Sequence, residues 1–163
     1  MNTGGSGYGR FRPFRLVSAA LCASTVAAFA GTAAATTGTQ LLISHMRKTP
    51  SALGARHATG TFTARLSIAG QNGSFTWKLT FAHLSGRALH AGIYFGKAAK
   101  PSQLAMLLCN KCSPNAQGYY HGPYVAGQRF VRAILHGRAY VVVQTKNNPK
   151  GEIRGGIKVE ATH

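Results

Sequence analysis

Apolar and polar residues alternate with a period of two in the middle of the chain. Between residues 61 and 68 (TFTARLSI) every second side chain is apolar, beginning with Phe62, and residues 75 to 81 (FTWKLTF) repeat the alternation. Alternation of this kind predicts half-buried β-strands, because successive side chains of a strand point to opposite faces. Between the two segments, Asn72-Gly73 can adopt positive φ at little cost. The pattern therefore predicts a β-hairpin with its turn over residues 69–73.

Further segments have the composition of strands. Residues 87–95 (RALHAGIYF), 138–145 (RAYVVVQT) and 152–159 (EIRGGIKV) are separated from their neighbours by Gly- or Pro-containing turns, and residues 104–108 are an apolar run. Strands joined by short turns pair antiparallel, because parallel neighbours need longer crossovers. We expect an all-β fold, an antiparallel β-sandwich or Greek-key barrel.

The remaining segments break this rhythm. Residues 127–135 (GQRFVRAIL) repeat apolar residues at three- and four-residue spacing and predict one short amphipathic helix. Residues 109–122 are rich in Asn, Gly, Pro and Tyr, and we interpret them as an ordered loop held by its cysteines. Residues 36–56 are expected to be a flexible lead-in, in which a short helix near residues 40–48 is an alternative.

The amino-terminal segment has the pattern of an export signal. Arg10, Arg12 and Arg15 precede an apolar stretch from Leu16 to Ala30 that ends in small residues. The stretch is shorter than the roughly 20 residues of a spanning helix, which favours cleavage over anchoring. We therefore expect a signal peptide over 1–35, a folded domain over 57–160, and a product that is secreted or associated with the cell envelope. A membrane would be contacted only through an uncleaved signal segment.

The charge balance is extreme. The chain carries 19 Lys and Arg residues against two acids, Glu152 and Glu160, for a formal net charge of +17. Such a surplus creates a long-range positive field that attracts polyanions, and a solvated basic surface without a partner is the alternative interpretation. Since an exported chain does not meet DNA and no recognition helix is evident, we expect an anionic polymer or envelope component as partner and no nucleic acid.

Two cysteines remain after the predicted signal. Cys109 and Cys112 are three residues apart, and a disulfide is the default for such a pair in an oxidising compartment. A thioredoxin-like redox site would need Cys109 at a helix N-terminus, and a zinc site would need further ligands, with His121 as the nearest candidate. We expect the disulfide, and we expect no metal or other cofactor.

A candidate ligand-contact loop combines aromatic and basic side chains. Its members are Lys111, Tyr119, Tyr120, His121 and Tyr124. Aromatic rings beside cations can stack on sugars or bases. The alternative is that the tyrosines cover the disulfide and fill the edge of the sandwich.

The scarcity of carboxylates argues against catalysis. Hydrolytic and transfer reactions usually need a positioned carboxylate, and Glu152 and Glu160 are the two that the chain has. Glu152 precedes Arg154 by two residues, so an ion pair on one strand face is the expected role. No catalytic residue is therefore assigned, and the chain is expected not to be an enzyme.

The assembled segments resemble the CHRD domain, a family named for chordin and found in many exported microbial proteins. The resemblance rests on residues 62–66 (FTARL), 74–81 (SFTWKLTF), 84–86 (LSG) and above all 139–155, where AYVVVQT is followed by NPKGEIRG. Within that tail we single out a structural motif of Gly151, Glu152, Arg154 and Gly155. The family has a poorly defined activity, so the resemblance implies a fold and an exported setting.

The CHRD domain is similar in layout to the copper/zinc superoxide dismutase sandwich. Family members often carry a His-x-His pair on the strand after the Leu-Ser-Gly turn, and this chain has Gly92 and Tyr94 there. Neither residue offers an imidazole, so the resemblance does not carry a copper site to this chain. We expect a non-enzymatic binding or structural protein, and a metal-dependent redox protein is the alternative.

Overall fold

In the computed structural model, residues 38–54, 56–97 and 103–160 are described. They lie in one compact unit, Ala34–His163. The elements in chain order are β1 (Gly38–Lys48), β2 (Thr59–Ala69), β3 (Asn72–Ala82), β4 (Ala88–Phe95), β5 (Leu104–Asn110), β6 (Asn115–Gly122), α1 (Pro123–Ala126), α2 (Gln128–Leu135), β7 (Ala139–Thr145), β8 (Ile153–Gly156) and β9 (Lys158–Glu160).

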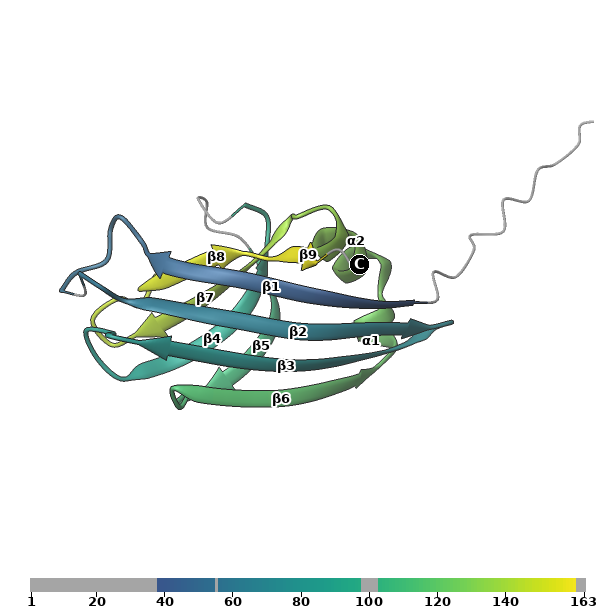
Figure 1. Cartoon of the computed structure of the whole chain (residues 1–163), viewed down its shortest axis with the longest axis horizontal. Coiled ribbons are helices and arrows are strands. Elements are labelled where there is room, and N and C mark those ends of the chain that lie inside the picture. Colours follow the sequence, from purple (N-terminus) through teal and green to yellow (C-terminus); the bar gives the residue numbers. More distant parts are fainter. Residues whose placement is uncertain (1–37, 55, 98–102, 161–163) are drawn as a thin grey trace, which may run out of the picture. The chain divides into compact units, whose positions relative to one another are not determined.

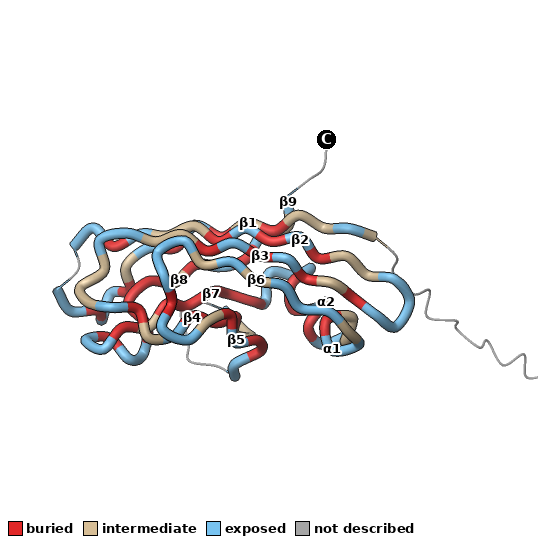
Figure 2. The backbone as a smooth tube through the Cα atoms, turned by 90° about the horizontal axis from the view of Figure 1, so that it is seen from below, coloured by how far each residue is buried: buried red, intermediate tan, exposed pale blue. Residues whose placement is uncertain are grey.

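The described strands form one antiparallel sheet that folds into two layers. Their order is β5-β4-β7-β8-β1-β2-β3-β6, and β9 pairs with β1. In Figures 1 and 2, β1, β2, β3 and β6 form one layer and β4, β5 and β7 form the other, with β8 pairing both β7 and β1. The predicted all-β, antiparallel sandwich or barrel is confirmed, as a nearly closed barrel-like sheet.

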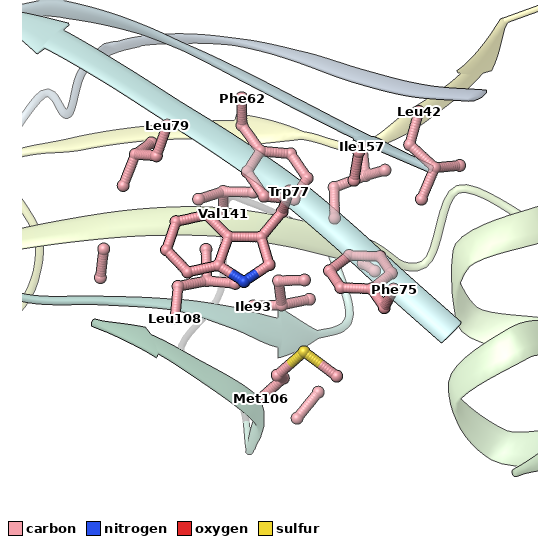
Figure 3. Packing of buried hydrophobic residues seen from close by; sticks show 14 of the residues in the cluster. Leu42, Phe62, Phe75, Trp77, Leu79, Ile93, Met106, Leu108, Val141 and Ile157 are labelled. Carbon is pink, nitrogen blue, oxygen red and sulfur yellow. The ribbon is translucent and has the colours of Figure 1, made fainter. Parts of the chain in front are cut away.

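The core fills the space between the layers. Phe62, Leu66 and Phe75 of one layer are fully buried, as are Ile93 and Val141 of the other. Figure 3 shows the indole of Trp77 extending from β3 towards side chains of the second layer. These are the apolar positions of the two-residue alternation, so burial of one sheet face is what the sequence pattern encodes.

Two tyrosine side chains join the free edges of the sheet. β5 and β6 are the two ends of the strand order, and no strand pairing between them is described. The hydroxyl of Tyr120 donates to the carbonyl oxygen of Leu107, and that of Tyr124 donates to the carbonyl oxygen of Ala105. These hydrogen bonds link β6 and α1 to β5 and leave the barrel nearly closed.

The predicted hairpin is confirmed as β2 and β3, with a correction to its turn. Ala69 pairs with Asn72, so the connecting residues are Gly70 and Gln71, and Gly70 has φ of 61°. Asn72-Gly73 belongs to the strand instead. Gly73 is buried there because α1 packs against it, and a Cβ at this position would lie 3.0 Å from Val125 Cγ1.

The flexible lead-in expected over residues 36–56 is wrong over residues 38–48, and so is its helical alternative near residues 40–48. Residues 38–48 form β1, which pairs with β2 on one side and with β8 and β9 on the other. Leu42, Ser44 and Met46 are buried on its inner face. Because Leu41 and Ile43 next to them are also apolar, the sequence shows no clear alternation here, and the domain begins well before residue 57.

The ordered loop over residues 109–122 is also wrong in part. Its second half is β6, which pairs along β3 from Gly73↔Gly122 to Thr80↔Asn115. The expected helix is confirmed as α2, preceded by the short α1. The strand expected over residues 152–159 is divided into β8 and β9 at Ile157, which is buried and donates its N–H to the Ala139 carbonyl at 2.9 Å.

Among the described residues, no helix has the length and apolar character needed to cross a membrane. The predicted signal peptide over residues 1–35 lies outside the described residues.

Candidate binding surface on the outer sheet face

The side of the first layer that faces away from the core carries polar and charged side chains. We call it the outer face, and it is formed by β9, β1, β2, β3 and β6. Inner-facing Ala64 and Trp77 alternate there with outward-facing Thr63, Arg65 and Lys78, as the sequence pattern predicted. The outer face contains a shallow hollow of about 750 Å³ lined by Leu41, Leu42, Thr63, Ala64, Arg65, Thr76, Trp77, Lys78, Gln117, Gly118, Tyr119 and Glu160.

The strand register aligns these side chains in rows across the sheet. Arg65 of β2 is opposite Thr76 of β3, which in turn is opposite Tyr119 of β6. In the next row, Lys78 is opposite both Thr63 and Gln117. Residues directly opposite each other in antiparallel strands have adjacent side chains on the same face. The hollow is therefore crossed by two parallel rows that combine hydroxyl, amide, cationic and aromatic groups.

Tyr119 supplies an exposed aromatic surface at the β6 side of the hollow. Its side chain is 61% exposed, and its ring stacks on that of His121 with 6.4 Å between centroids. Because residues 119 and 121 share a strand face, this stacked pair is positioned by the backbone of β6. Such a ring can pack against the apolar face of a sugar.

The charge of the outer face is mainly positive. Arg65 and Lys78 line the hollow, and Lys158 of β9 pairs with Ile43 of β1 on the same side. Glu160 is the acidic residue in the lining. Since the whole chain has only two acidic side chains, its carboxylates can neutralise few of its cations, and the positive charge of this face favours an anionic ligand.

The structure divides the five residues of the candidate ligand-contact loop. Tyr119 and His121 lie together on the outer face. The hydroxyls of Tyr120 and Tyr124 instead donate hydrogen bonds to backbone carbonyl oxygens of β5. Lys111 lies apart from them, in a different hollow with Arg87 and Cys112. The five residues therefore do not share one surface, because β6 is a strand whose alternate residues face opposite sides, and ligand contact by any of them stays a prediction.

The disulfide between Cys109 and Cys112 is confirmed, with 5.4 Å between the two Cα atoms. Cys109 belongs to β5 rather than to a helix N-terminus, so the helix dipole that a thioredoxin-like site requires does not act on it. The zinc alternative needed these sulfurs together with His121, which lies on β6 beside Ser74. The disulfide links the end of β5 to the turn before β6.

Glu152 lies at the centre of a buried polar cluster, which we call the Glu152 cluster. The Ser85 backbone N–H donates to Oε1 at 2.5 Å. Oε2 accepts from the Ser85 hydroxyl at 2.8 Å, the Thr145 hydroxyl at 2.6 Å and the Asn148 amide at 3.0 Å. The Asn148 side chain also makes two hydrogen bonds to the backbone of Leu53. Its Oδ1 accepts from the N–H, and its Nδ2 donates to the carbonyl oxygen. The expected partner, Arg154, instead donates to the Lys150 carbonyl at 3.2 Å. The cluster therefore ties together three loops at one end of the sandwich.

The pKa of Glu152 is lowered. Burial would raise it, since desolvation disfavours the charged form, but the hydrogen bonds from Thr145, Ser85 and Asn148 outweigh burial and hold the group ionised. All four donors stabilise the anion in place, and the side chain is fully buried. This arrangement gives Glu152 a structural role.

The two glycines of the predicted motif lie where the backbone is crowded. Gly151 has φ of 112°, and a Cβ there would be 2.6 Å from Val142 Cγ1. A Cβ at Gly155 would be 2.5 Å from the carbonyl oxygen of His45. These contacts explain why the segment before and within β8 needs residues without side chains.

The positions that carry a His-x-His pair in similar proteins are closed to metal ligands here. A Cβ at Gly92 would be 2.7 Å from Leu104 Cδ1 and 3.0 Å from the carbonyl oxygen of Met106, so a side chain there would require both the leucine and the neighbouring backbone of β5 to shift. Tyr94 stacks on Tyr140 with 5.7 Å between ring centroids, and burial followed by the charge of Tyr140 raises its pKa, despite the opposing hydrogen bond from Gln144. In the described part of the chain, no three His, Cys, Asp or Glu side chains are grouped to hold a metal ion.

Sequence reasoning missed the hollow because it missed β6. The alternation did place Thr63, Arg65 and Lys78 on the polar face of the hairpin. What it lacked was the strand opposite them, since the glycine and asparagine of residues 115–122 (NAQGYYHG) suggest a loop. One signal in that segment could have indicated a strand. Every second residue, Gln117, Tyr119 and His121, is a large polar or aromatic residue, as on one face of a strand.

Comparison with known families identifies the domain. Residues 32–157 match the family model of the CHRD domain. No curated protein and no solved structure matches the chain. The family match spans β1 through β8, including the hairpin, the Glu152 cluster and the glycine motif. The chain therefore belongs to the CHRD domain family.

Proposed function

We propose that this CHRD domain is a non-enzymatic, exported binding protein that contacts an anionic polysaccharide or another anionic envelope polymer through its outer face. The observation that carries the proposal is the hollow in which Arg65 and Lys78 lie in the same rows as hydroxyl and amide groups and the exposed ring of Tyr119. Cations bind the anionic groups, and the ring packs on sugar faces.

Three features support the exported setting and the lack of catalysis. The amino-terminal arginines and apolar stretch have the pattern of a signal peptide, and a disulfide suits an oxidising compartment. Glu152 is occupied by structural hydrogen bonds. Sequencing the mature amino terminus tests export. Elemental analysis tests the alternative redox function, which requires stoichiometric copper or zinc, whereas we expect neither.

Binding of the full chain to polygalacturonate tests the outer face. Arg65→Gln with Lys78→Gln should weaken binding at least tenfold. The matched control, Lys146→Gln with Lys150→Gln, removes the same charge from an exposed turn and should change affinity less than twofold. Affinity should fall steeply with added salt, because exposed charges are screened. Retention that is the same at low and high salt would contradict the proposal.

Tyr119→Ala separates stacking from charge. The variant should lose affinity for polygalacturonate and keep its affinity for polyglutamate, which carries carboxylates without sugar rings. Equal loss for both polymers would show that Tyr119 does not contact sugar faces.

A further inference from the structure

A second hollow lies where α2 passes the ends of β4 and β7. It has a volume of about 630 Å³ and is lined by Phe95, Gly96, Gln128, Arg129, Arg132, Ala133, His136 and Arg138. We call it the arginine pocket. It is separate from the outer face, because none of its lining residues lines the hollow there.

We propose that the arginine pocket binds a phosphoryl oxyanion, either free or as part of a larger molecule. A guanidinium group presents forked N–H donors that match two oxygens of such an anion at once. Three guanidinium groups around one hollow can engage the several oxygens of a phosphoryl group more completely than the two oxygens of a carboxylate.

The fold brings the cations together from two elements. Arg129, Arg132 and His136 follow one another at three- and four-residue spacing along α2 and its C-terminal end, which places them on one side of the helix. Arg138 comes from the segment that enters β7. Its position is fixed by its N–H, which donates to the Ala133 carbonyl at 2.7 Å, and by its carbonyl, which accepts from the Gly96 N–H at 2.8 Å.

All three arginines are exposed, and the guanidinium of one of them is also held in place by neighbouring side chains. The guanidinium of Arg129 lies 4.3 Å from the centroid of the Phe95 ring and donates to Gln103 Oε1 at 2.8 Å. Arg132 and Arg138 are exposed, so their donors are accessible to a ligand. Phe95 and Ala133 supply apolar surface beside these charges.

The positive charge of the pocket is not balanced by acidic side chains. The chain has two, of which Glu152 is buried in its own cluster and Glu160 lines the hollow of the outer face. Bringing several cations around one hollow without an acid costs electrostatic energy that a bound anion recovers. A free or terminal phosphoryl group, which is a dianion near neutral pH, recovers more of it than a monoanionic carboxylate or chloride, whereas a phosphodiester contributes one charge per phosphate.

Titration of the full chain with inorganic phosphate, at constant ionic strength maintained with chloride, tests the site. Binding is measured by calorimetry and by the imidazole NMR signals of His136. Arg132→Gln with Arg138→Gln should weaken phosphate binding at least tenfold. Arg65→Gln with Lys78→Gln is the matched control, with the same loss of net charge, and should change it less than twofold. Because all four residues are exposed, thermal unfolding should show both variants folded.

A second titration with a glycerol phosphate polymer distinguishes the source of the phosphoryl group. If both phosphate and the polymer bind, and the pocket variant weakens both, the pocket is a site for free or terminal phosphate. If only the polymer binds, and the pocket variant weakens that binding, the pocket recognises the phosphodiester groups of a polymer. Equal weakening by the two variants, or no binding of either probe above the chloride background, would overturn the proposal. Polygalacturonate binding tests the outer face separately, so either proposal can fail without the other.

Discussion

Glu152 illustrates how one residue can be buried with its charge in a chain dominated by cations. Removing a carboxylate from water is costly unless hydrogen bonds replace its hydration. Both oxygens of Glu152 receive such bonds, from a backbone N–H, two hydroxyls and one amide. The sequence identified Glu152 as structural, but it suggested Arg154 as the partner because spacing along one strand was the available information. The actual partners, Ser85 and Thr145, come from other loops and strands.

Replacing Glu152 by Gln should destabilise the domain by about 2 to 3 kcal/mol, since hydrogen bonds to a charged group are lost and buried donors are left facing an amide N–H₂. Urea unfolding measures the change. Glu160→Gln is the matched control, because it removes an equal charge from an exposed side chain and should have an effect near zero. A similar effect of both substitutions would show that charge alone, and not the buried hydrogen bonds, matters.

The same carboxylate gives a defined pH dependence. Its pKa in the folded protein is below the ordinary value of 4.5, so the unfolded state binds more protons in this range. The stabilisation from Glu152 is complete above that ordinary pKa and is lost as the pH falls through the lower, folded pKa. The difference in stability between the wild type and Glu152→Gln should therefore shrink on acidification, and a difference that stays constant would contradict this assignment.

At the scale of elements, the strands with uninterrupted alternation were predictable and the irregular ones were not. β2 and β3 follow from their alternation, β4 and β7 from their strand-like composition between turns, and α2 from its three- and four-residue spacing. β1 was obscured by Leu41 and Ile43, which are apolar although they lie on the outer face. β6 contains Gly118, a residue that usually indicates a turn. In both strands a tertiary requirement outweighs local propensity.

The requirement at Gly118 is the indole of Trp77. A Cβ at residue 118 would lie 2.6 Å from Trp77 Cζ2 and 2.8 Å from Nε1. Gly118→Ala should therefore displace either β6 or the indole, at a cost of about 1 to 3 kcal/mol, which is typical of overpacking. Trp77 is the one tryptophan of the chain, so its fluorescence emission should shift together with the stability.

Gly156→Ala is the control for that substitution, because nothing lies within 4 Å of the added Cβ and the residue is also in a strand. We expect a change of less than about 0.5 kcal/mol there, as for surface substitutions generally. If Gly118→Ala left both stability and emission unchanged, the close approach of β6 to Trp77 would not be what requires glycine.

For the whole molecule, the sequence predicted the all-β architecture but not the strand β1, with which the domain begins, or its place in the sheet. The pairing order places β1 between β2 and the β8–β9 segment, so residues close to the beginning of the domain hold together strands from its middle and its end. Such long-range pairing has no signature in local periodicity. The two hollows have the same property, since each combines side chains from segments far apart in the sequence.

A chain beginning at His57 should consequently fail to fold, although it retains every strand that the sequence pattern made evident. It lacks Leu42 and Met46, which are 2% and 1% exposed, and burial of each such side chain contributes about 2 to 5 kcal/mol. Their combined loss approaches the roughly 5 to 15 kcal/mol that stabilises a typical domain. It also exposes the edges of β2 and β8, which favours aggregation.

A chain beginning at Ala34 retains the whole compact unit and is the control. Far-UV circular dichroism and urea unfolding should show a cooperative transition for this chain and none for the chain beginning at His57. A cooperative transition with a similar denaturant dependence in both would mean that β1 adds little buried surface, because that dependence scales with the area exposed on unfolding. Such a result would require β2 and β8 to close the sheet without β1, which lies between them in the observed strand order and pairs with both.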